Sequence, residues 1–246
     1  MAKQERALRT REALIKSAAT VFDRDGFSVA SLSAISSLAG VSNGALHFHF
    51  ASKAALADSV EDAAADRLHR LIGMREDGAG NALQLLVDTS HDLARRIADD
   101  VVLRAGFELS RQQIRVVSRD LHHEWHQWVA AILERAEREG VLSAVSPEAA
   151  AASVVAATTG FEVLGTHDPR WLSNRTITRF WQLLLPRLAA ASALGDIEAA
   201  GSRTSVPASA PGFAPGSGAG GARPVRTPGT VRTAGAPGKD RGGTAP

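Results

Sequence analysis

The sequence lacks several features that would assign a protein to a common functional class. It contains no cysteine, so disulfides, thiolate metal sites and cysteine nucleophiles are excluded. Its start, MAKQERALRTRE, has none of the apolar character of a signal peptide, and no run of 18 apolar residues could span a membrane. Aromatic residues are only 5% of the 246, whereas 44% are hydrophobic. We expect a globular protein with a sizeable core, located in the cytoplasm.

Charge and turn-forming residues are distributed unevenly. Residues 1–60 contain seven Lys and Arg against five Asp and Glu, residues 61–200 contain 15 against 20, and residues 201–246 contain six against one. A basic start favours contact with a polyanion, although scattered solvating charge would give similar totals. The last 46 residues hold 11 of the 22 Gly and seven of the 10 Pro. With so little apolar surface to bury, residues 201–246 are predicted to form a disordered tail.

Before this tail, apolar residues recur at the spacing of helices. A first helix is predicted from about residue 7 to 24, with Gly26 closing it. Alternation of period two is scarce, so we predict an all-α fold. The later helices are expected at residues 52–73, 82–98, 101–117, 119–138, 147–164 and 174–191.

The stretch GVSNGALHFHF, residues 40–50, admits three interpretations. It spells the G-x-S-x-G of a hydrolase nucleophile elbow around Ser42, but that motif needs a preceding strand, and residues 31–39 have helical periodicity. His47 and His49 could bind a metal together only on a strand, because residues two apart on a helix point to different sides. The third interpretation is a helix-turn-helix: a helix capped by Ser31, a turn at Gly40, and a second helix that begins after Ser42.

In the helix-turn-helix interpretation, apolar and polar side chains separate onto two faces. Leu32, Ile35, Val41, Leu46 and Phe50 face inward, whereas the outward face offers hydrogen-bonding groups and the small residues Gly44 and Ala45. Lys53, at the start of the next helix, is expected to hold a phosphate. The candidate DNA-binding residues are Ser31, Ser33, Ser42, Asn43, Gly44, His47 and Lys53.

A second histidine cluster, HHEWH at residues 122–126, nearly spells the zinc motif H-E-x-x-H. His122 and His126 lie four apart on a predicted helix, but the second histidine of the motif falls one residue early and no third ligand is implied. We therefore favour exposed polar helix positions over a metal site, and we expect neither a metal nor a cofactor.

At these residues the sequence resembles the TetR family of transcriptional regulators. The resemblance covers about residues 7–68 and rests on VFDRDGF followed by SLSAISSLAGVSNGALHFHFASKAAL. GALHFHF with ASKAALADSV, and later LRAGFELSRQ and EWHQWV, look most like the γ-butyrolactone receptors of actinobacteria and their receptor-like relatives. The family commonly has tyrosine where His47 stands. The resemblance implies a DNA-binding domain at 1–68, with the helix-turn-helix at about 31–50, and a ligand-binding and dimerisation domain at 69–200.

Two features of the second domain bear on ligand binding and dimerisation. Trp125 and Trp128 lie on an inward stripe with Leu121 and Ile132, which any buried helix would show; the resemblance implies that Trp125 contacts the ligand. Residues 149–164 are rich in small side chains, and a large apolar face follows, so a subunit interface is expected there. That face consists of Ile177, Phe180, Trp181, Leu184 and Leu188.

The sequence thus predicts a transcriptional repressor and no enzyme. A homodimer would bind a pseudo-palindromic operator in double-stranded DNA, associated with the nucleoid, and a small apolar ligand of the γ-butyrolactone type would release it. One alternative is a receptor-like regulator that responds to an antibiotic or its precursor. Another is a DNA-binding protein that responds to no ligand. A hydrolase is the least favoured alternative.

Overall fold

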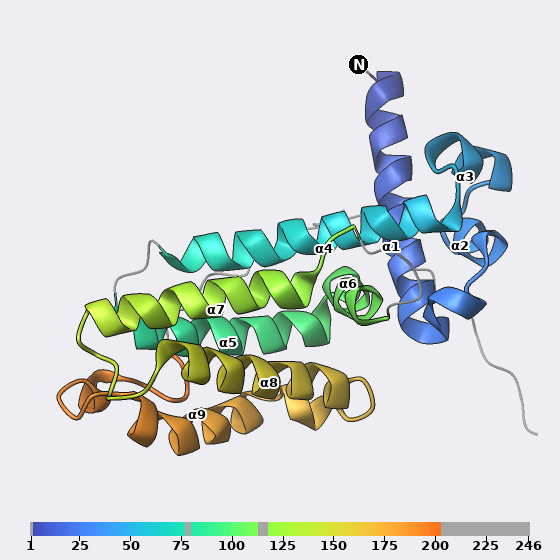
Figure 1. Ribbon diagram of the computed structural model, residues 1–246. Coiled ribbons are helices and arrows are strands. Elements are labelled where there is room, and N and C mark those ends of the chain that lie inside the picture. Colours follow the sequence, from blue (N-terminus) through green and yellow to red (C-terminus); the bar gives the residue numbers. More distant parts are fainter. Residues whose placement is uncertain (1, 77–79, 113–117, 203–246) are drawn as a thin grey trace, which may run out of the picture. The chain divides into compact units, whose positions relative to one another are not determined.

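The computed structural model describes residues 2–76, 80–112 and 118–202 and consists of helices (Figure 1), which confirms the all-α prediction. The predicted tail falls, from residue 203 on, outside these residues. Within them no strand is formed, and Leu142 and Ala189 make an isolated antiparallel bridge. The α-helices are α1 (Ala2–Val29), α2 (Leu32–Leu38), α3 (Asn43–His49), α4 (Lys53–Glu76), α5 (Ala82–Asp99), α6 (Val101–Arg111), α7 (Leu121–Arg138), α8 (Pro147–Gly165) and α9 (Asn174–Leu188). Two 3₁₀ turns, η1 (Pro169–Leu172) and η2 (Leu194–Asp196), complete the order.

Side-chain caps determine where many of these helices begin. The side chains of Ser31, Ser42, Asn81, Asp120 and Ser146 each accept a hydrogen bond from a backbone N–H in the first turn of the helix that follows. Such N–H groups have no partner within the helix, so a capping oxygen stabilises the start. Because caps are local, helices α5 to α9 begin within two residues of their predicted positions. The predicted extension of α6 to residue 117 is wrong, because the helix ends at Arg111 and Gln112 is no longer helical (ψ 86°); residues 113–117 lie outside the described ranges.

Helix α1 is longer than predicted and contains a break. The backbone at Gly26 leaves the helical range (φ 77°, ψ 157°), a conformation open to glycine, but helical turns continue to Val29. Gly26 therefore redirects α1 and does not close it. The carbonyl groups of Phe27, Ser28 and Ala30 lie in the turn beyond Gly26 and accept hydrogen bonds from Lys53.

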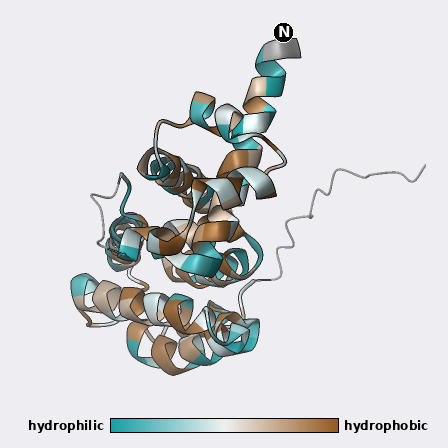
Figure 2. Cartoon of the chain, turned by 90° about the vertical axis from the view of Figure 1, so that its right-hand side faces the viewer, coloured by the Kyte–Doolittle hydropathy of each residue, from teal (hydrophilic) through white to brown (hydrophobic). Residues whose placement is uncertain are grey.

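The helices form two regions connected by α4. Helices α1 to α3 form the helix-turn-helix region, and α5 to α9 form what is called here the body. In Figure 1, α4 runs from the helix-turn-helix region along the body, α5 and α7 lie next to it, and α8 and α9 form the layer beyond. Most helices have one hydrophobic and one hydrophilic side (Figure 2), as expected when each covers a shared core. The predicted boundary at residue 68 falls inside α4, which continues unbroken to Glu76.

Helix α5 lies at the centre of the body, and several of its polar residues are buried. Thr89 and Ser90 are at most 2% exposed, and their hydroxyls donate to the carbonyls of Leu85 and Leu86 four residues earlier. Helices α4, α6, α7, α8 and α9 all contact α5, which explains why every residue from 85 to 94 is buried; Arg95 and Arg96, which follow, are exposed. The polar groups are satisfied locally, as burial requires.

Helices α4 and α6 approach each other unusually closely. A Cβ atom placed on Gly106 of α6 would lie 2.2 Å from the Cβ atom of Ala64 on α4. No side chain fits at that distance, so glycine is needed for this contact. The close approach fixes the position of α6 against the helix that leads to the helix-turn-helix region.

The segment after α9 continues along α5 up to Ser202. The amide of Gln84 joins the backbone of Glu198, with Glu198 N–H donating to Gln84 Oε1 at 2.7 Å. The N–H of Ser202 donates to Asp88 Oδ1 at 2.7 Å, and the Ser202 hydroxyl donates to the other carboxylate oxygen. Gly201 and Ser202, which the prediction placed in the tail, therefore belong to this packed segment.

None of the helices in the described ranges is both long enough and apolar enough to cross a bilayer.

Candidate DNA-binding and ligand-binding sites

Helices α2 and α3 form a helix-turn-helix, with Gly40 in the turn at φ 68°. Ile35 of α2 and Leu46 of α3 are fully buried, Phe50 is 4% exposed, and Leu32 and Val41 pack against the same core. The predicted inward face is thus confirmed. Because these side chains hold α3 against α1 and α2 on one side, the opposite side of α3 remains on the surface.

The outward side carries most of the residues expected to bind DNA. Ser31, Ser33, Ser42, Gly44 and His47 are exposed. The hydroxyl oxygens of Ser31 and Ser42 accept the capping bonds from Ala34 and Ala45, and each hydroxyl keeps a proton to donate. Ser42 therefore serves as the cap of α3. With no strand among the described residues, the hydrolase elbow has no structural basis here.

Asn43 is exposed and also fixed by a contact within the helix-turn-helix. The buried Ser36 of α2 donates from its hydroxyl to Asn43 Oδ1 at 2.5 Å, and the Ser33 carbonyl lies 3.0 Å from the same hydroxyl oxygen. Bound through its oxygen, the amide directs its nitrogen away from α2. Within the described part of the chain that nitrogen makes no hydrogen bond, so it can donate to an acceptor on a base.

Lys53 does not fit the expected phosphate contact. Its ammonium donates to the carbonyl oxygens of Phe27, Ser28 and Ala30 at 2.7, 3.1 and 2.8 Å, and lies 4.8 Å from the centre of the Phe27 ring. An ammonium has three N–H donors, and all three are used here. The carbonyls after the break in α1 have no further helical turn to bond to, which is why they attract the cation. In this arrangement Lys53 joins the start of α4 to the end of α1.

Phe48 is a surface residue that the sequence interpretation missed. It lies on α3 with 83% of its surface exposed, and its only aromatic contact in the described residues is an edge-on one with the neighbouring His49. Leu46 and Phe50 point inward two residues to either side, so their spacing could have placed Phe48 on the outward side. A phenylalanine there offers apolar contact, for example to the methyl group of thymine.

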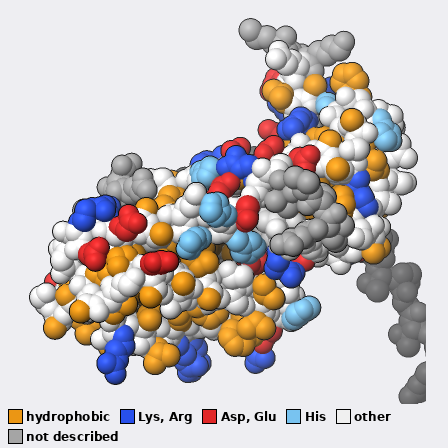
Figure 3. Space-filling view, viewed as in Figure 1, with side chains coloured by type: hydrophobic (Ala, Val, Ile, Leu, Met, Phe, Trp, Pro, Cys, Tyr) orange, Lys and Arg blue, Asp and Glu red, His pale blue; other side chains and the backbone are white. Residues whose placement is uncertain are grey.

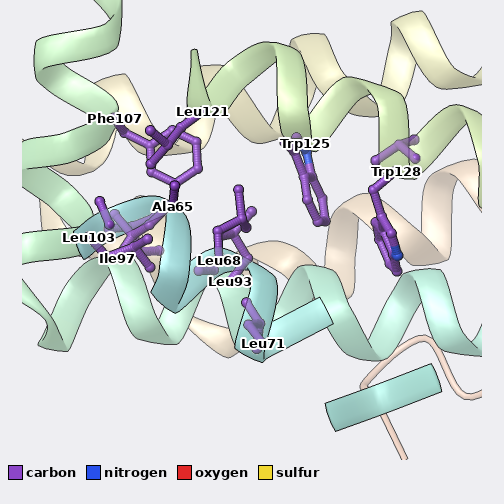
Figure 4. Packing of buried hydrophobic residues seen from close by; sticks show 14 of the residues in the cluster. Ala65, Leu68, Leu71, Leu93, Ile97, Leu103, Phe107, Leu121, Trp125 and Trp128 are labelled. Carbon is purple, nitrogen blue, oxygen red and sulfur yellow. The ribbon is translucent and has the colours of Figure 1, made fainter. Parts of the chain in front are cut away.

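Trp125 is buried in the body and has a polar partner. Its side chain is 1% exposed, and the indole N–H donates to Thr158 Oγ1 of α8 at 2.9 Å. Trp128 stacks on it with ring centres 5.0 Å apart (Figure 4). The indole nitrogen of Trp128 is buried with no hydrogen-bond partner among the described residues. The inward stripe is thus confirmed, and of the two indoles only that of Trp128 leaves its donor without an acceptor.

Comparisons with known proteins bear on both sites. A family model described as "Bacterial regulatory proteins, tetR family" matches residues 14–60. The A-factor receptor protein of Streptomyces griseus is 32% identical over 206 residues, which cover 82% of this chain and 71% of the relative. The chain belongs to the tetR family. The resemblance drawn from GALHFHF and the surrounding motifs is therefore confirmed.

Two solved structures are similar to this tetR-family chain along most of its length. A γ-butyrolactone receptor described as ArpA-like is 28% identical with a TM-score of 0.70, and the match covers 79% of this chain and 96% of that one. CprB of Streptomyces coelicolor, solved in complex with its operator sequence, is 27% identical with a TM-score of 0.67, covering 78% and 94%. The first is described as a receptor and the second as a TetR family protein.

The histidine cluster on α7 differs from the sequence prediction. His123 and His126 are exposed as expected, but His122 is only partly so: its Nε2 lies 2.8 Å from Glu162 Oε2 on α8. Glu162 is 3% exposed, and His122 packs edge-on against Phe107. The prediction failed because α8 is distant in sequence. No group of three or more potential metal ligands forms within the described ranges.

The expected subunit interface is also corrected in part. Ile177, Trp181 and Leu188 of α9 are at most 2% exposed, because they pack against the body of their own chain. Phe180 and Leu184, the other two residues of the predicted face, are partly exposed. Leu183 is 81% exposed, and hydrophobic side chains gather over the lower part of Figure 3, where α8 and α9 lie in Figure 1. Leu164 and Trp171 are also exposed, at 42% and 39%.

Proposed function

We propose that this tetR-family protein is a transcriptional repressor that binds a pseudo-palindromic operator as a homodimer and is released by a small apolar ligand of the γ-butyrolactone type. The observation that carries the proposal is the outward side of α3, exposed and rich in hydrogen-bonding groups, in a chain that is similar to the A-factor receptor along 82% of its length. It acts by binding and not by catalysis.

The proposed contacts with DNA divide into two kinds. Asn43, whose amide nitrogen points away from α2, reads base edges, and Phe48 gives apolar contact in the major groove. The hydroxyls of Ser31, Ser33 and Ser42, with His47, contact the phosphate backbone, and Gly44 lets α3 approach closely. In this proposal Lys53 supports the fold and does not contact phosphate.

Dimerisation follows from the geometry of double-stranded DNA. Two recognition helices that read related half-sites must lie about 34 Å apart, or a multiple of it, so a symmetric pair of subunits is needed. We propose that α8 and α9 form the interface, because an exposed leucine such as Leu183 and the nearby Leu164 are otherwise left in water. The ligand would bind within the domain that contains this interface, residues 69–200.

The ligand would act through the α7–α8 contact. Trp125 bonds to Thr158 across these helices, so a molecule that enters beside Trp125 must compete with that hydrogen bond or change its geometry. A ligand that favours one arrangement of the body shifts the population away from the arrangement that fits the operator. Two similar solved structures are described as γ-butyrolactone receptors, which supports this ligand class.

A gel-shift experiment on DNA upstream of the chain's own gene tests the proposal. We expect sequence-selective binding as a dimer, absent on scrambled DNA of equal length, and release by a γ-butyrolactone. Failure to select any sequence would overturn the DNA-binding proposal. Release by an antibiotic or its precursor alone would favour the receptor-like alternative, and binding that no added molecule changes would favour a regulator without a ligand.

A further inference from the structure

Arg104 of α6 joins three helices through one guanidinium group. Its Nε and Nη2 donate to the two carboxylate oxygens of Asp23 on α1 at 2.9 and 3.0 Å. Its Nη1 donates to the carbonyls of Ile97 and Ala98 at the end of α5, at 2.7 and 3.0 Å. The paired, parallel bonds to Asp23 are the strongest geometry that Arg and carboxylate adopt. The same side chain thus bonds to the body and to the helix-turn-helix region.

The body holds Arg104 in place independently of Asp23. Carbonyls at a helix C-terminus carry partial negative charge, so the end of α5 attracts the guanidinium by itself. Helix α6 is fixed in turn against α4 by the close approach of Gly106 to Ala64. The guanidinium of Arg104 is therefore held in place by the end of α5, and its helix is held by α4. Asp23, three residues before the break at Gly26, is the group that docks onto it.

An open groove lies beside this pair. It has a volume of about 640 Å³ and is lined by Phe22 to Arg24 and Gly26 of α1, by Arg104, Glu108 and Gln112 with their neighbours, and by residues around η1. At the groove, the side chains of α1 and of the body do not fill the space between them. Asp23 and Arg104 are about three-quarters buried, at 24% and 23% exposure of the side chains, so water screens their bonds only in part.

We propose that the Asp23–Arg104 pair is the contact that fixes the orientation of the helix-turn-helix region on the body, and that operator affinity depends on it. Breaking the pair leaves Arg104 on α5 while α1 gains freedom to move across the groove. The part of this inference that concerns DNA rests on the proposed function. A subunit whose competent orientation is populated only part of the time binds more weakly by that fraction.

The chain offers a matched control for this test. Asp25 lies two residues after Asp23 in the same helix, but it pairs with its neighbour Arg24 and with no described residue of the body. Asp23→Asn and Asp25→Asn remove the same charge from the same part of α1, so any general gain in attraction to DNA is common to both. Arg104→Lys, which keeps the charge and loses the paired geometry, serves as the second variant.

The orientation can be measured directly because the natural chain has no cysteine. Spin labels are attached to cysteines at the exposed positions Glu12 on α1 and Gln127 on α7, and the distance distribution is recorded by pulsed electron resonance. Dilution with unlabelled protein of the same variant restricts the signal to pairs within one subunit, whatever the oligomeric state. This measurement needs neither DNA nor a ligand, so it remains valid if the proposed function fails.

We expect Asp23→Asn and Arg104→Lys to broaden the distance distribution while Asp25→Asn leaves it as in the natural protein. We also expect Asp23→Asn to bind the operator roughly 3- to 30-fold more weakly than Asp25→Asn does. An unchanged distribution in a folded Asp23→Asn variant overturns the proposal. A broadened distribution with operator affinity equal to that of Asp25→Asn overturns its regulatory part.

Discussion

The backbone N–H of Ser202 donates to the carboxylate of Asp88, a residue 114 positions earlier, at 2.7 Å. Asp88 is 7% exposed and also accepts from the amide of Gln84 and the hydroxyl of Ser202. The segment that follows α9 is therefore bonded to the central helix of the body as far as Ser202. Hydrogen bonds to α5 therefore reach the end of the described chain.

Two truncations should differ in stability although they differ by only two residues. Ending the chain after Ser202 keeps the donors of Asp88, whereas ending it after Ala200 removes both Ser202 donors from a buried carboxylate. We expect the shorter chain to lose about 2 kcal/mol of unfolding free energy, the range for hydrogen bonds to charged groups. Chemical denaturation of both chains measures this. Equal stability would show that the Asp88 contacts contribute nothing.

His91 should make stability depend on pH. Burial lowers its pKa below the ordinary 6.5, and this exceeds the opposing effects of the Ala199 carbonyl, Asp88 and Asp92, while Arg95 adds to the lowering. The folded state thus favours the neutral ring, which bonds to Ala199 and Asn174. The free energy of unfolding therefore has its full value above pH 6.5. It decreases as the pH falls from 6.5 toward the lowered pKa of His91. His91→Gln should reduce this slope in unfolding measured from pH 5 to 8, whereas His126→Gln, at an exposed site, should keep it.

Lys53→Met distinguishes the structural role of Lys53 from a phosphate contact. The variant leaves the carbonyls of Phe27, Ser28 and Ala30 without their donor, so we expect a lower melting temperature and a loss of about 2 kcal/mol. A phosphate contact predicts another result: an unchanged melting temperature and a salt dependence of operator binding that is smaller by roughly one in slope. Calorimetry and titrations at several salt concentrations decide between them.

Phe48→Ala should weaken binding at particular thymines. Replacing each thymine of the mapped operator by uracil removes only the C5 methyl group. We expect the natural protein to lose about 0.8 kcal/mol at one or two of these positions, the contribution of one buried carbon, and Phe48→Ala to be insensitive there. If the variant loses affinity but keeps the same sensitivity to uracil, Phe48 does not contact a methyl group.

Trp125→Phe separates a ligand contact from ordinary core packing. The variant keeps most of the packing and loses the bond to Thr158, which is worth about 1 kcal/mol. If Trp125 contacts the ligand, operator binding stays normal and release by a γ-butyrolactone fails. Trp128→Phe and Thr158→Val, measured alongside, show how much is due to the aromatic stack and to the hydrogen bond. Normal release by a folded Trp125→Phe protein would contradict the assignment.

The sequence predicted best what depends on neighbouring residues. Caps such as Ser31 and Ser42 lie within a few residues of the groups that they bond, and the periodicity that buries Leu46 is a property of one helix. The starts of α5 to α9 and the helix-turn-helix could therefore be found without coordinates, whereas the ends of α1 could not.

Contacts between distant segments were beyond the sequence. A lysine at the start of a helix suggested a phosphate contact, because the break at Gly26 and the carbonyls it presents depend on how α1 packs. His122 meets Glu162, and Arg104 meets Asp23, across 40 and 81 positions. Charge and residue type show that such groups need partners, but only the packed helices determine which ones they meet.

The hydrogen bond from Ser36 to Asn43 has a consequence for the entropy of recognition. A surface asparagine samples several rotamers in water and loses that freedom when it binds, whereas the amide of Asn43 is already restrained through its oxygen. Ordering one mobile side chain at an interface costs roughly 0.5–1.5 kcal/mol. In this chain much of that loss occurs when the helix-turn-helix folds, so less of it remains to oppose any contact that the Asn43 nitrogen makes.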